Sequence, residues 1–236
     1  MPFPDAVHAT TFRAFGVTVT ARLADPALRG SAEATLPPGW EPGEAADAVA
    51  TVDLRDAGGL DRFDAEVRRL VATHAPDHVF VHAGVVARDG RALVLPATTF
   101  AGKSELVAAL VRAGADYLSD EYAVLDEAGH VHPYPRRISL RGQGERSAEE
   151  LGGRTASGPL PVALIVATRH EPGVEFAPER RTAAAGALLL LEHAGQALEH
   201  PERVLAAVQA AADGAVVLAG PRGEAADAAR VLLAAL

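Results

Sequence analysis

The sequence predicts an α/β protein with a small N-terminal α+β portion, residues 1–75, followed by a larger α/β domain, residues 76–236. Three observations lead to this prediction. In the first portion, stretches typical of strands are followed by one long stretch with helical spacing. After Pro76, short apolar strands alternate with helices, as in proteins whose helices cover a sheet. Hydrophobic residues make up 49% and charged residues 22% of the chain, which is enough to build a core.

The first portion contains strand-like and helix-like stretches separated by a turn-rich segment. Thr10–Arg22 alternates polar and apolar residues, as half-buried strands do, and Ala48–Leu54 is typical of another strand. The segment between them, Asp25–Glu44, is rich in Pro, Gly and Ala and predicts a loop. Asp61–His74 has its apolar residues at helical spacing. No chemical motif stands out in this portion.

The second portion begins with two apolar stretches, Val79–Val86 and Arg91–Leu95, which predict strands. Asp89-Gly90 lies between them and is a dipeptide typical of tight hairpin turns. The further elements expected are a helix at Ser104–Gly114, strands at Tyr117–Leu125 and Leu160–Thr168, helices at Ala183–Ala194 and Pro201–Ala212, a strand at Ala215–Ala219 and a helix at Glu224–Leu236.

Charge and composition exclude several classes of protein. The net charge of −9 argues against nucleic-acid binding, which needs clustered Lys and Arg. The absence of cysteine excludes disulfides and Cys-ligated metals. The N-terminus lacks the pattern of a signal peptide, and the longest apolar runs, Pro161–Ala167 and Ala183–Leu191, are well short of the ~20 residues that cross a bilayer. We therefore expect a soluble, cytoplasmic protein with no nucleic-acid or membrane partner.

A phosphate-binding turn is predicted where the strand Ala92–Leu95 is followed by a loop and by Gly102-Lys103-Ser104 at a helix start. Backbone N–H groups at such a start wrap a phosphate, the lysine reaches the β- and γ-phosphates, and the Ser104 hydroxyl contacts Mg²⁺. Lys103 is the only lysine of the chain. The residues expected to bind the nucleotide are Thr98, Thr99, Phe100, Ala101, Gly102, Lys103 and Ser104.

One position departs from the full phosphate-loop pattern, whose first glycine is replaced by Ala97. If the loop needs a positive φ there, alanine costs on the order of 1–2 kcal/mol. A plain helix start with Gly102 as a turn residue is the alternative interpretation of this tripeptide.

Acidic residues follow the predicted helix, at Asp120-Glu121. Carboxylates serve the two needs of phosphoryl transfer, because they bind Mg²⁺ and accept the proton of the attacking hydroxyl. A parallel strand beside the phosphate-loop strand would bring them to the site; a solvated turn is the alternative. His82 interrupts an apolar strand, where it is either a core histidine bonded to the backbone or a partner of these carboxylates.

The stretch from His82 to Leu125 resembles the catalytic core of HPr kinase/phosphorylase. In that family a histidine precedes the phosphate loop, the loop ends in Gly-Lys-Ser-Glu, and an Arg-Gly segment leads to a pair of aspartates. The matching residues here are His82, Gly102-Lys103-Ser104-Glu105, Arg112-Ala113-Gly114 and Asp120-Glu121. The resemblance covers about 45 residues closely and extends weakly to Pro133–Leu140. It implies a serine kinase related to HPr kinase, with a phosphate-loop fold like that of phosphoenolpyruvate carboxykinase.

The resemblance also implies a role for each matching residue. Lys103 would hold the phosphates, Ser104 the Mg²⁺, and Asp120 would deprotonate the acceptor hydroxyl. Glu121 stands where the family has its second aspartate, and would help bind the metal or pair with His82. The resulting Ser-Asp-Glu sequence resembles that of HPr-kinase-like proteins whose substrate is uncertain. This resemblance does not favour HPr itself as the phosphoryl acceptor.

The expected function is therefore an ATP- and Mg²⁺-dependent kinase that transfers a phosphoryl group to a hydroxyl, on a peptide or protein serine. A small-molecule kinase with the same core is one alternative. A nucleotide-binding or partner-binding protein without catalysis is another, and an α/β domain with an accidental Gly-Lys-Ser is the third. The family's kinase is hexameric, so a homo-oligomer is compatible with the resemblance, although no segment identifies a subunit interface.

Three other segments have two interpretations each. His130 and His132 would share one face of a strand, but two nearby histidines fall short of a metal ligand set. The loop that contains them continues to Arg136 and Arg137, which are surface residues or contacts of phosphate or acceptor. Gly142–Gly158 predicts a mobile connection or a lid over the acceptor.

Overall fold

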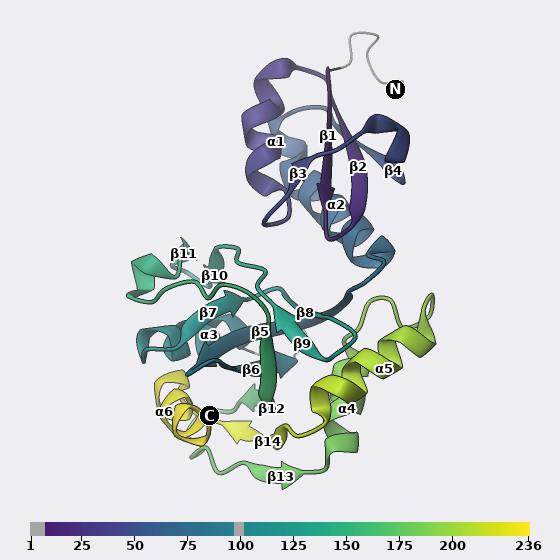
Figure 1. Cartoon of the computed structure of the whole chain (residues 1–236). Coiled ribbons are helices and arrows are strands. Elements are labelled where there is room, and N and C mark those ends of the chain that lie inside the picture. Colours follow the sequence, from purple (N-terminus) through teal and green to yellow (C-terminus); the bar gives the residue numbers. More distant parts are fainter. Residues whose placement is uncertain (1–7, 97–101) are drawn as a thin grey trace. The chain divides into compact units, whose positions relative to one another are not determined.

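The computed structural model describes residues 8–96 and 102–236 (Figure 1). The chain divides into two compact units, Met1–His78 and Val79–Leu236, and each has its own sheets and helices. No helix in the described part of the chain is both long enough and apolar enough to cross a membrane.

The first unit is a four-stranded sheet in the order β3-β1-β2-β4 with two helices. Strands β1 and β2 are antiparallel, whereas β2 and β4 are parallel. Helix α2 packs on β2 and β4, and its residues Phe63 and Val67 are buried, as is Phe12 of β1. The bounds are β1 His8–Ala14, β2 Val17–Leu23, α1 Arg29–Thr35, β3 Glu41–Pro42, β4 Ala50–Leu54 and α2 Leu60–His74, with 3₁₀ turns at Pro26–Leu28, Ala45–Asp47 and Ala57–Gly59.

Two expectations for this unit need correction. The alternating stretch Thr10–Arg22 is a hairpin rather than an uninterrupted alternation, because Phe15 and Gly16 turn the chain with φ of 49° and 79°. The loop expected over 25–44 contains α1. The Asp25 side chain accepts a hydrogen bond from the Ala27 N–H and caps the 3₁₀ turn Pro26–Leu28, which leads directly into α1; the Pro- and Gly-rich composition obscured this start signal.

The second unit is built around an eight-stranded sheet in the order β13-β14-β12-β6-β5-β8-β9, in which β7 also pairs with β5 and β9 also pairs with β12. A separate two-stranded sheet joins β10 and β11. The strands are β5 Val79–Arg88, β6 Arg91–Pro96, β7 Asp116–Ser119, β8 Tyr122–Leu125, β9 His130–His132, β10 Ile138–Leu140, β11 Gly144–Arg146, β12 Leu160–His170, β13 Glu179–Arg181 and β14 Val216–Arg222. The helices are α3 Lys103–Arg112, α4 Ala183–Glu192, α5 Pro201–Ala212 and α6 Ala225–Ala235, with a 3₁₀ turn at Glu149–Leu151.

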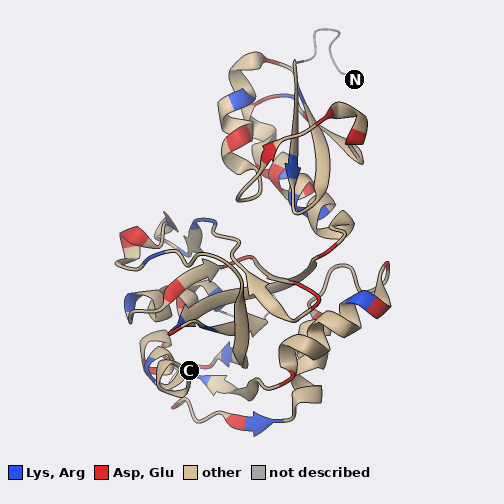
Figure 2. Ribbon diagram, in the orientation of Figure 1, with Lys and Arg blue, Asp and Glu red and all other residues tan. Residues whose placement is uncertain are grey.

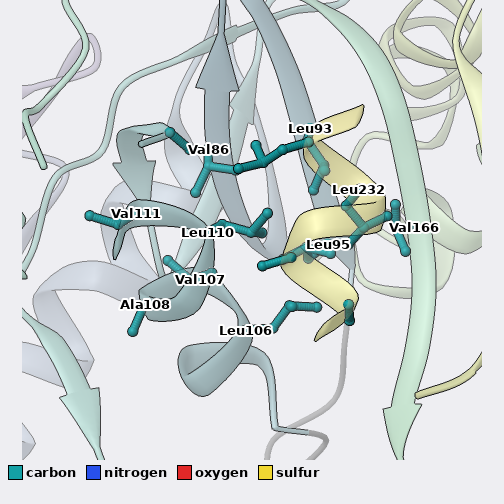
Figure 3. Packing of buried hydrophobic residues seen from close by; sticks show 14 of the residues in the cluster. Val86, Leu93, Leu95, Leu106, Val107, Ala108, Leu110, Val111, Val166 and Leu232 are labelled. Carbon is teal, nitrogen blue, oxygen red and sulfur yellow. The ribbon is translucent and has the colours of Figure 1, made fainter. Parts of the chain in front are cut away.

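Helices cover both faces of this sheet. Leu93 and Leu95 of β6 point to the face covered by α3 and α6, where they join Leu106, Leu110 and the other side chains of Figure 3. The alternate residue Val94 joins the cluster beneath α4 and α5. This division follows from the two-residue period of a strand, and it explains why β5 and β6 are apolar on both faces.

The hairpin expected between β5 and β6 is confirmed. Asp89 and Gly90 have φ of 52° and 74°, the two positive values that a tight turn of this kind needs. Strand β6 then runs parallel to β12, which runs parallel to β14. The carboxyl ends of these three strands therefore lie at one edge of the sheet, the edge at which open α/β proteins bind ligands.

Three further expectations for the second unit differ from the structure. The strand expected at Tyr117–Leu125 is interrupted after Ser119, and its two parts are β7 and β8. The loop expected from His130 begins as β9, which pairs with β8 and β12 because the prolines stand only after His132.

The segment 142–158 contains β11 and a 3₁₀ turn. It is held by hydrogen bonds of 2.8 Å between Tyr117 and the backbone of Arg154 and Ala156, and by the ion pair of Arg137 with Glu150 at 2.7 Å. Basic and acidic residues are interspersed around β10 and β11 (Figure 2). The hydrogen bonds with Tyr117 join the segment to β7, and whether the segment moves as a lid stays a prediction.

Candidate phosphate site

The first turn of α3 is shaped by Gly102. This residue has φ of 78°, a left-handed conformation that L side chains rarely adopt, and it immediately precedes the helix. A Cβ atom there would lie 2.6 Å from the guanidinium nitrogen Nη2 of Arg222, so a side chain would also displace that group. The Gly102 carbonyl accepts the first helical hydrogen bond, from the Leu106 N–H at 3.2 Å.

The side chain of Lys103 lies over a second glycine, Gly84 of β5. A Cβ atom on Gly84 would lie 2.5 Å from Val107 Cγ2 and 3.2 Å from Lys103 Cγ. The absence of a side chain at this position therefore lets α3 approach the sheet closely. The pairing of β5 with β7 and β8 places Asp120 alongside Gly84, so the lysine stem is directed toward the acidic residues.

Lys103 and Asp120 form the central contact of the site. Lys103 Nζ lies 3.4 Å from Asp120 Oδ1 and also donates to the Asp120 backbone carbonyl. The two side chains are only 8% and 9% exposed. The contact joins the start of α3 to the break between β7 and β8, and thereby brings together two residues that the sequence proposed for one site.

Burial raises the pKa of the Asp120 carboxyl above its ordinary value, and the neighbouring charge of Glu121 adds to the rise. The Lys103 ammonium and a hydrogen bond with the Ser104 side chain lower this pKa, but only in part. A carboxyl group with a raised pKa, beside a cation and at a strand end, has the properties of a general base more than those of a surface ion pair.

The turn that carries the acidic residues is held by Ser119, which is fully buried. Its Oγ accepts hydrogen bonds of 3.0 Å from the backbone N–H groups of Glu121 and Tyr122. The Glu121 carbonyl accepts a further bond from Ala83 of β5 at 3.2 Å. The interruption of the strand is therefore a fixed turn, and Asp120 stands at its tip.

His82 lies on β5, two residues before Gly84, and therefore on the same face of the strand. Its backbone N–H donates to the His193 carbonyl at 2.8 Å, and its ring forms an edge contact with Tyr122, with ring centroids 6.5 Å apart. The histidine thus belongs to the strand that separates β6 from the acidic turn. A role for its side chain in the chemistry stays a prediction.

The expectation of adjacent parallel strands is wrong for the acidic residues. Strand β5 lies between β6 and β8 and is antiparallel to both. The acidic turn nevertheless reaches Lys103 because α3 crosses over β5 at Gly84. Of the other predicted nucleotide-binding residues, Thr98, Thr99, Phe100 and Ala101 lie outside the described residues, as does Ala97.

Sequence reasoning missed Arg222, the last residue of β14. The residue is 2% exposed, and its guanidinium donates to the Gly102 carbonyl at 2.7 Å and to the Gly223 carbonyl at 2.9 Å. Its position in the sequence could have identified it. Arg222 lies between a predicted strand and a predicted helix, and the carboxyl ends of parallel strands form the ligand-binding edge of an α/β sheet. Gly84 and Ser119 were missed as positioning residues because their effect depends on contacts between strands and helices.

His130 and His132 both lie beside the carboxylate of Asp126. His132 Nε2 lies 3.0 Å and His130 Nδ1 3.7 Å from Asp126 Oδ2. Among residues 8–96 and 102–236, no group of three or more His, Asp or Glu side chains could hold a metal ion. The histidines therefore serve a local turn in the described structure.

Hard oxygen ligands for Mg²⁺ are nevertheless present near Lys103. The Ser104 hydroxyl and the carboxylates of Asp120 and Glu121 are of the type that Mg²⁺ prefers, and this ion commonly binds through one or two carboxylates together with substrate phosphates. Such a set fits an ion that arrives with a nucleotide better than an ion held by protein ligands alone. Ser104 and Glu121 remain the predicted metal ligands.

Two cavities lie elsewhere in this unit. One of about 590 Å³ is lined by apolar residues of α4 and α5, including Leu188 and Leu205. The other, of about 540 Å³, lies beside α6 and is lined by Arg88 and Arg230 among others. Neither is lined by Lys103, so the candidate site lies outside both of these cavities.

Similarity to known proteins is found for the structure of this chain and not for its sequence. No protein-family model and no curated protein matches the sequence. The structure is similar to the HPr(Ser) kinase/phosphatase from Coxiella burnetii, with a TM-score of 0.41 and 16% sequence identity over 66% of this chain and 93% of that chain.

Proposed function

We propose that this chain is an ATP-dependent kinase that transfers the γ-phosphoryl group to a hydroxyl, on a serine of a peptide or protein. The observation that carries the proposal is the contact of Lys103, at the start of α3, with the buried carboxylate of Asp120. A cation at a helix N-terminus binds phosphate, and a carboxylate beside it accepts a proton, so the two parts of phosphoryl transfer are adjacent.

Each residue has a distinct role in this reaction. The backbone at the start of α3 and the Lys103 ammonium bind the β- and γ-phosphates and stabilise the charge that develops between them. Asp120 accepts the proton of the acceptor hydroxyl. The hydroxyl oxygen then bonds to the γ-phosphorus as the bond to the β-phosphate oxygen breaks, and ADP carries the electrons of that bond away.

Ser104 and Glu121 hold Mg²⁺ in this proposal, and Mg²⁺ when bound neutralises phosphate charge. Lys103 leaves its contact with Asp120 when a nucleotide arrives, because the phosphates are stronger partners for the ammonium. Asp120 is thereby released to face the acceptor. Burial raises the pKa of the Asp120 carboxyl, which makes its carboxylate a stronger base for the hydroxyl proton.

The test replaces one charge at a time. We expect Lys103→Met to weaken Mg·ATP binding by more than about tenfold, since a charged hydrogen bond contributes roughly 1.5–3 kcal/mol. Asp120→Asn should bind Mg·ATP with similar affinity but lose phosphoryl transfer by about 10²–10⁴-fold, as removal of a general base does. Binding is measured by calorimetry and transfer by ADP release with serine-containing peptides and small hydroxyl compounds as acceptors.

The matched control is Arg112→Met, which removes an exposed cation from the other end of α3. It should leave both binding and transfer unchanged. Transfer by Asp120→Asn at the parent rate would remove Asp120 from the role of base. Binding by the parent without ADP release for any acceptor would overturn the proposed kinase activity, and transfer to small hydroxyl compounds alone would overturn the proposed peptide or protein acceptor.

A further inference from the structure

Arg222 has an environment that folding alone does not explain. It is 2% exposed, and its hydrogen bonds to described residues go to the backbone carbonyls of Gly102 and Gly223. Its Nε is buried and has no hydrogen-bond partner among the residues that the structure describes. A buried cation that is not fully hydrogen-bonded costs free energy, and carbonyl dipoles compensate it less well than a carboxylate does.

The electrostatics point the same way. Burial lowers the pKa of the Arg222 guanidinium, and the charges of Glu105 and Glu224 restore it only in part. The group lies at the carboxyl end of β14, and its hydrogen bonds to described residues go to backbone carbonyls rather than to a carboxylate. Arginine remains protonated even so, which makes this a permanent positive charge at the edge where α3 begins.

The bond to Gly102 connects this charge to the phosphate turn. The same Gly102 carbonyl accepts from Leu106 and thus belongs to the first turn of α3, which carries Lys103. Through this carbonyl, β14 holds the start of α3. In the strand order of the sheet, β14 lies on one side of β6 and the strands next to Asp120, β5 and β8, lie on the other.

We propose that Arg222 is a positioning residue of the phosphate site: it holds the Gly102 carbonyl, fixes the first turn of α3, and supplies a buried positive charge that a bound phosphate group balances. The identity of the anion as a nucleotide phosphate rests on the proposed kinase function. The positioning of the helix start does not rest on it.

The proposal makes Arg222 different from a residue that only stabilises the fold. A structural role predicts that removing the side chain lowers the melting temperature of the nucleotide-free protein and leaves nucleotide affinity unchanged. A positioning role predicts the reverse. Removing the side chain weakens nucleotide binding, and because it also removes a buried charge, the melting temperature stays unchanged or rises.

The experiment compares Arg222→Met and Arg222→Lys with Arg230→Met, which removes an exposed arginine of α6. Hydrogen–deuterium exchange of the nucleotide-free full chain is followed at the first turn of α3, where the Leu106 N–H donates to Gly102. We expect faster exchange in Arg222→Met, an intermediate rate in Arg222→Lys, which keeps the charge and one donor group, and the parental rate in Arg230→Met. Melting temperatures are measured on the same samples.

Calorimetry with Mg·ATP then tests the charge. Arg222→Met should weaken binding by more than about tenfold, the effect of losing a charge-assisted hydrogen bond, whereas Arg222→Lys should lose less. Parental exchange at α3 in Arg222→Met would overturn the positioning role, and parental affinity in that variant would overturn the balancing of charge by phosphate. Failure of the parent chain itself to bind Mg·ATP would instead refute the proposed function and the charge part of this inference, while the exchange result would still decide the positioning role.

Discussion

Asp120 is a carboxylate held away from water next to the only lysine of the chain. Desolvation disfavours its charged form, and the lysine restores only part of what burial removes. The pKa of this carboxyl therefore depends on both its burial and the nearby ammonium, and it shifts when either changes. The arrival of phosphate and the departure of Lys103 are such changes, which is why the properties of this one side chain decide much of the proposed chemistry.

The first prediction concerns the titration of Asp120. Because its pKa is raised in the folded protein, we expect the midpoint in the nucleotide-free chain to lie above the ordinary value of about 3.9. The base is active when ionised, so transfer should fall as the pH falls through this midpoint. Carbon NMR of the side-chain carboxyl measures the midpoint, with Asp120→Asn identifying the signal. A midpoint at or below about 3.9 would contradict the assignment of a desolvated base.

The second prediction concerns Ser119, whose hydroxyl fixes the acidic turn. Ser119→Ala leaves two backbone N–H groups without their acceptor, so we expect the free energy of unfolding to fall by about 1–3 kcal/mol. Transfer should fall more than Mg·ATP binding, since Asp120 moves and Lys103 does not. Denaturant unfolding and steady-state kinetics check both effects. The exposed Ser139 of β10 provides the control, and Ser139→Ala should change stability by less than about 0.5 kcal/mol.

At the scale of the elements, the site depends on how closely α3 lies on β5. The glycine at position 84 permits that approach, and the helix then directs its first side chain across β5 to a turn that does not adjoin β6. The packing of Leu106, Leu110 and Val107 against the sheet holds the helix at this distance (Figure 3). A position that has no side chain thus controls where a functional side chain lies.

The third prediction follows from this packing. In Gly84→Ala the new methyl group would lie 2.5 Å from Val107 Cγ2, and the helix must move because the valine is fully buried. We expect a loss of about 1–3 kcal/mol in stability, typical of overpacking, together with weaker Mg·ATP binding. The combination with Val107→Ala removes the clash, so the double variant should lose less than the sum of the single variants. Additive losses would show that the contact does not set the helix position.

At the scale of the whole molecule, the residues of the candidate site belong to one of the two units. All described residues of the candidate site, from Gly84 to Arg222, belong to the unit Val79–Leu236, and both large apolar clusters of that unit are formed from its own residues. The unit Met1–His78 has a separate sheet and its own buried side chains, such as Phe12 and Phe63. Nucleotide binding is therefore a property of the second unit in this proposal.

The fourth prediction is that residues 79–236, expressed alone, fold and bind Mg·ATP with a dissociation constant within about threefold of that of the full chain, because domains with their own core fold independently. Circular dichroism and calorimetry measure the two properties. A folded fragment without affinity, beside a full chain that binds, would mean that the first unit contributes to the site. Transfer to peptide acceptors is compared in the same pair of proteins.

Much of the second unit could be predicted from the sequence, because its elements follow from local patterns. The hairpin at Asp89-Gly90 is set by two residues that tolerate positive φ, and the helix after Gly102 by apolar residues spaced for one face. The stretch 117–125 shows where local patterns fail. Its apolar residues fit one strand, but the chain is interrupted at Asp120, whose turn depends on the hydroxyl of Ser119 and on pairing with β5.

The sequence by itself determined the alternation of strands and helices, the helix start at Gly102-Lys103-Ser104 that we propose binds phosphate, and the carboxylates that could serve it. These are properties of neighbouring residues, whose spacing fixes periodicity, capping and charge. Only the tertiary structure decided that Lys103 meets Asp120 across β5 and that Arg222 holds the helix start. The physical reason is that both contacts join residues distant in the chain, and they depend on how closely α3 packs on the sheet and on which strand ends share its edge.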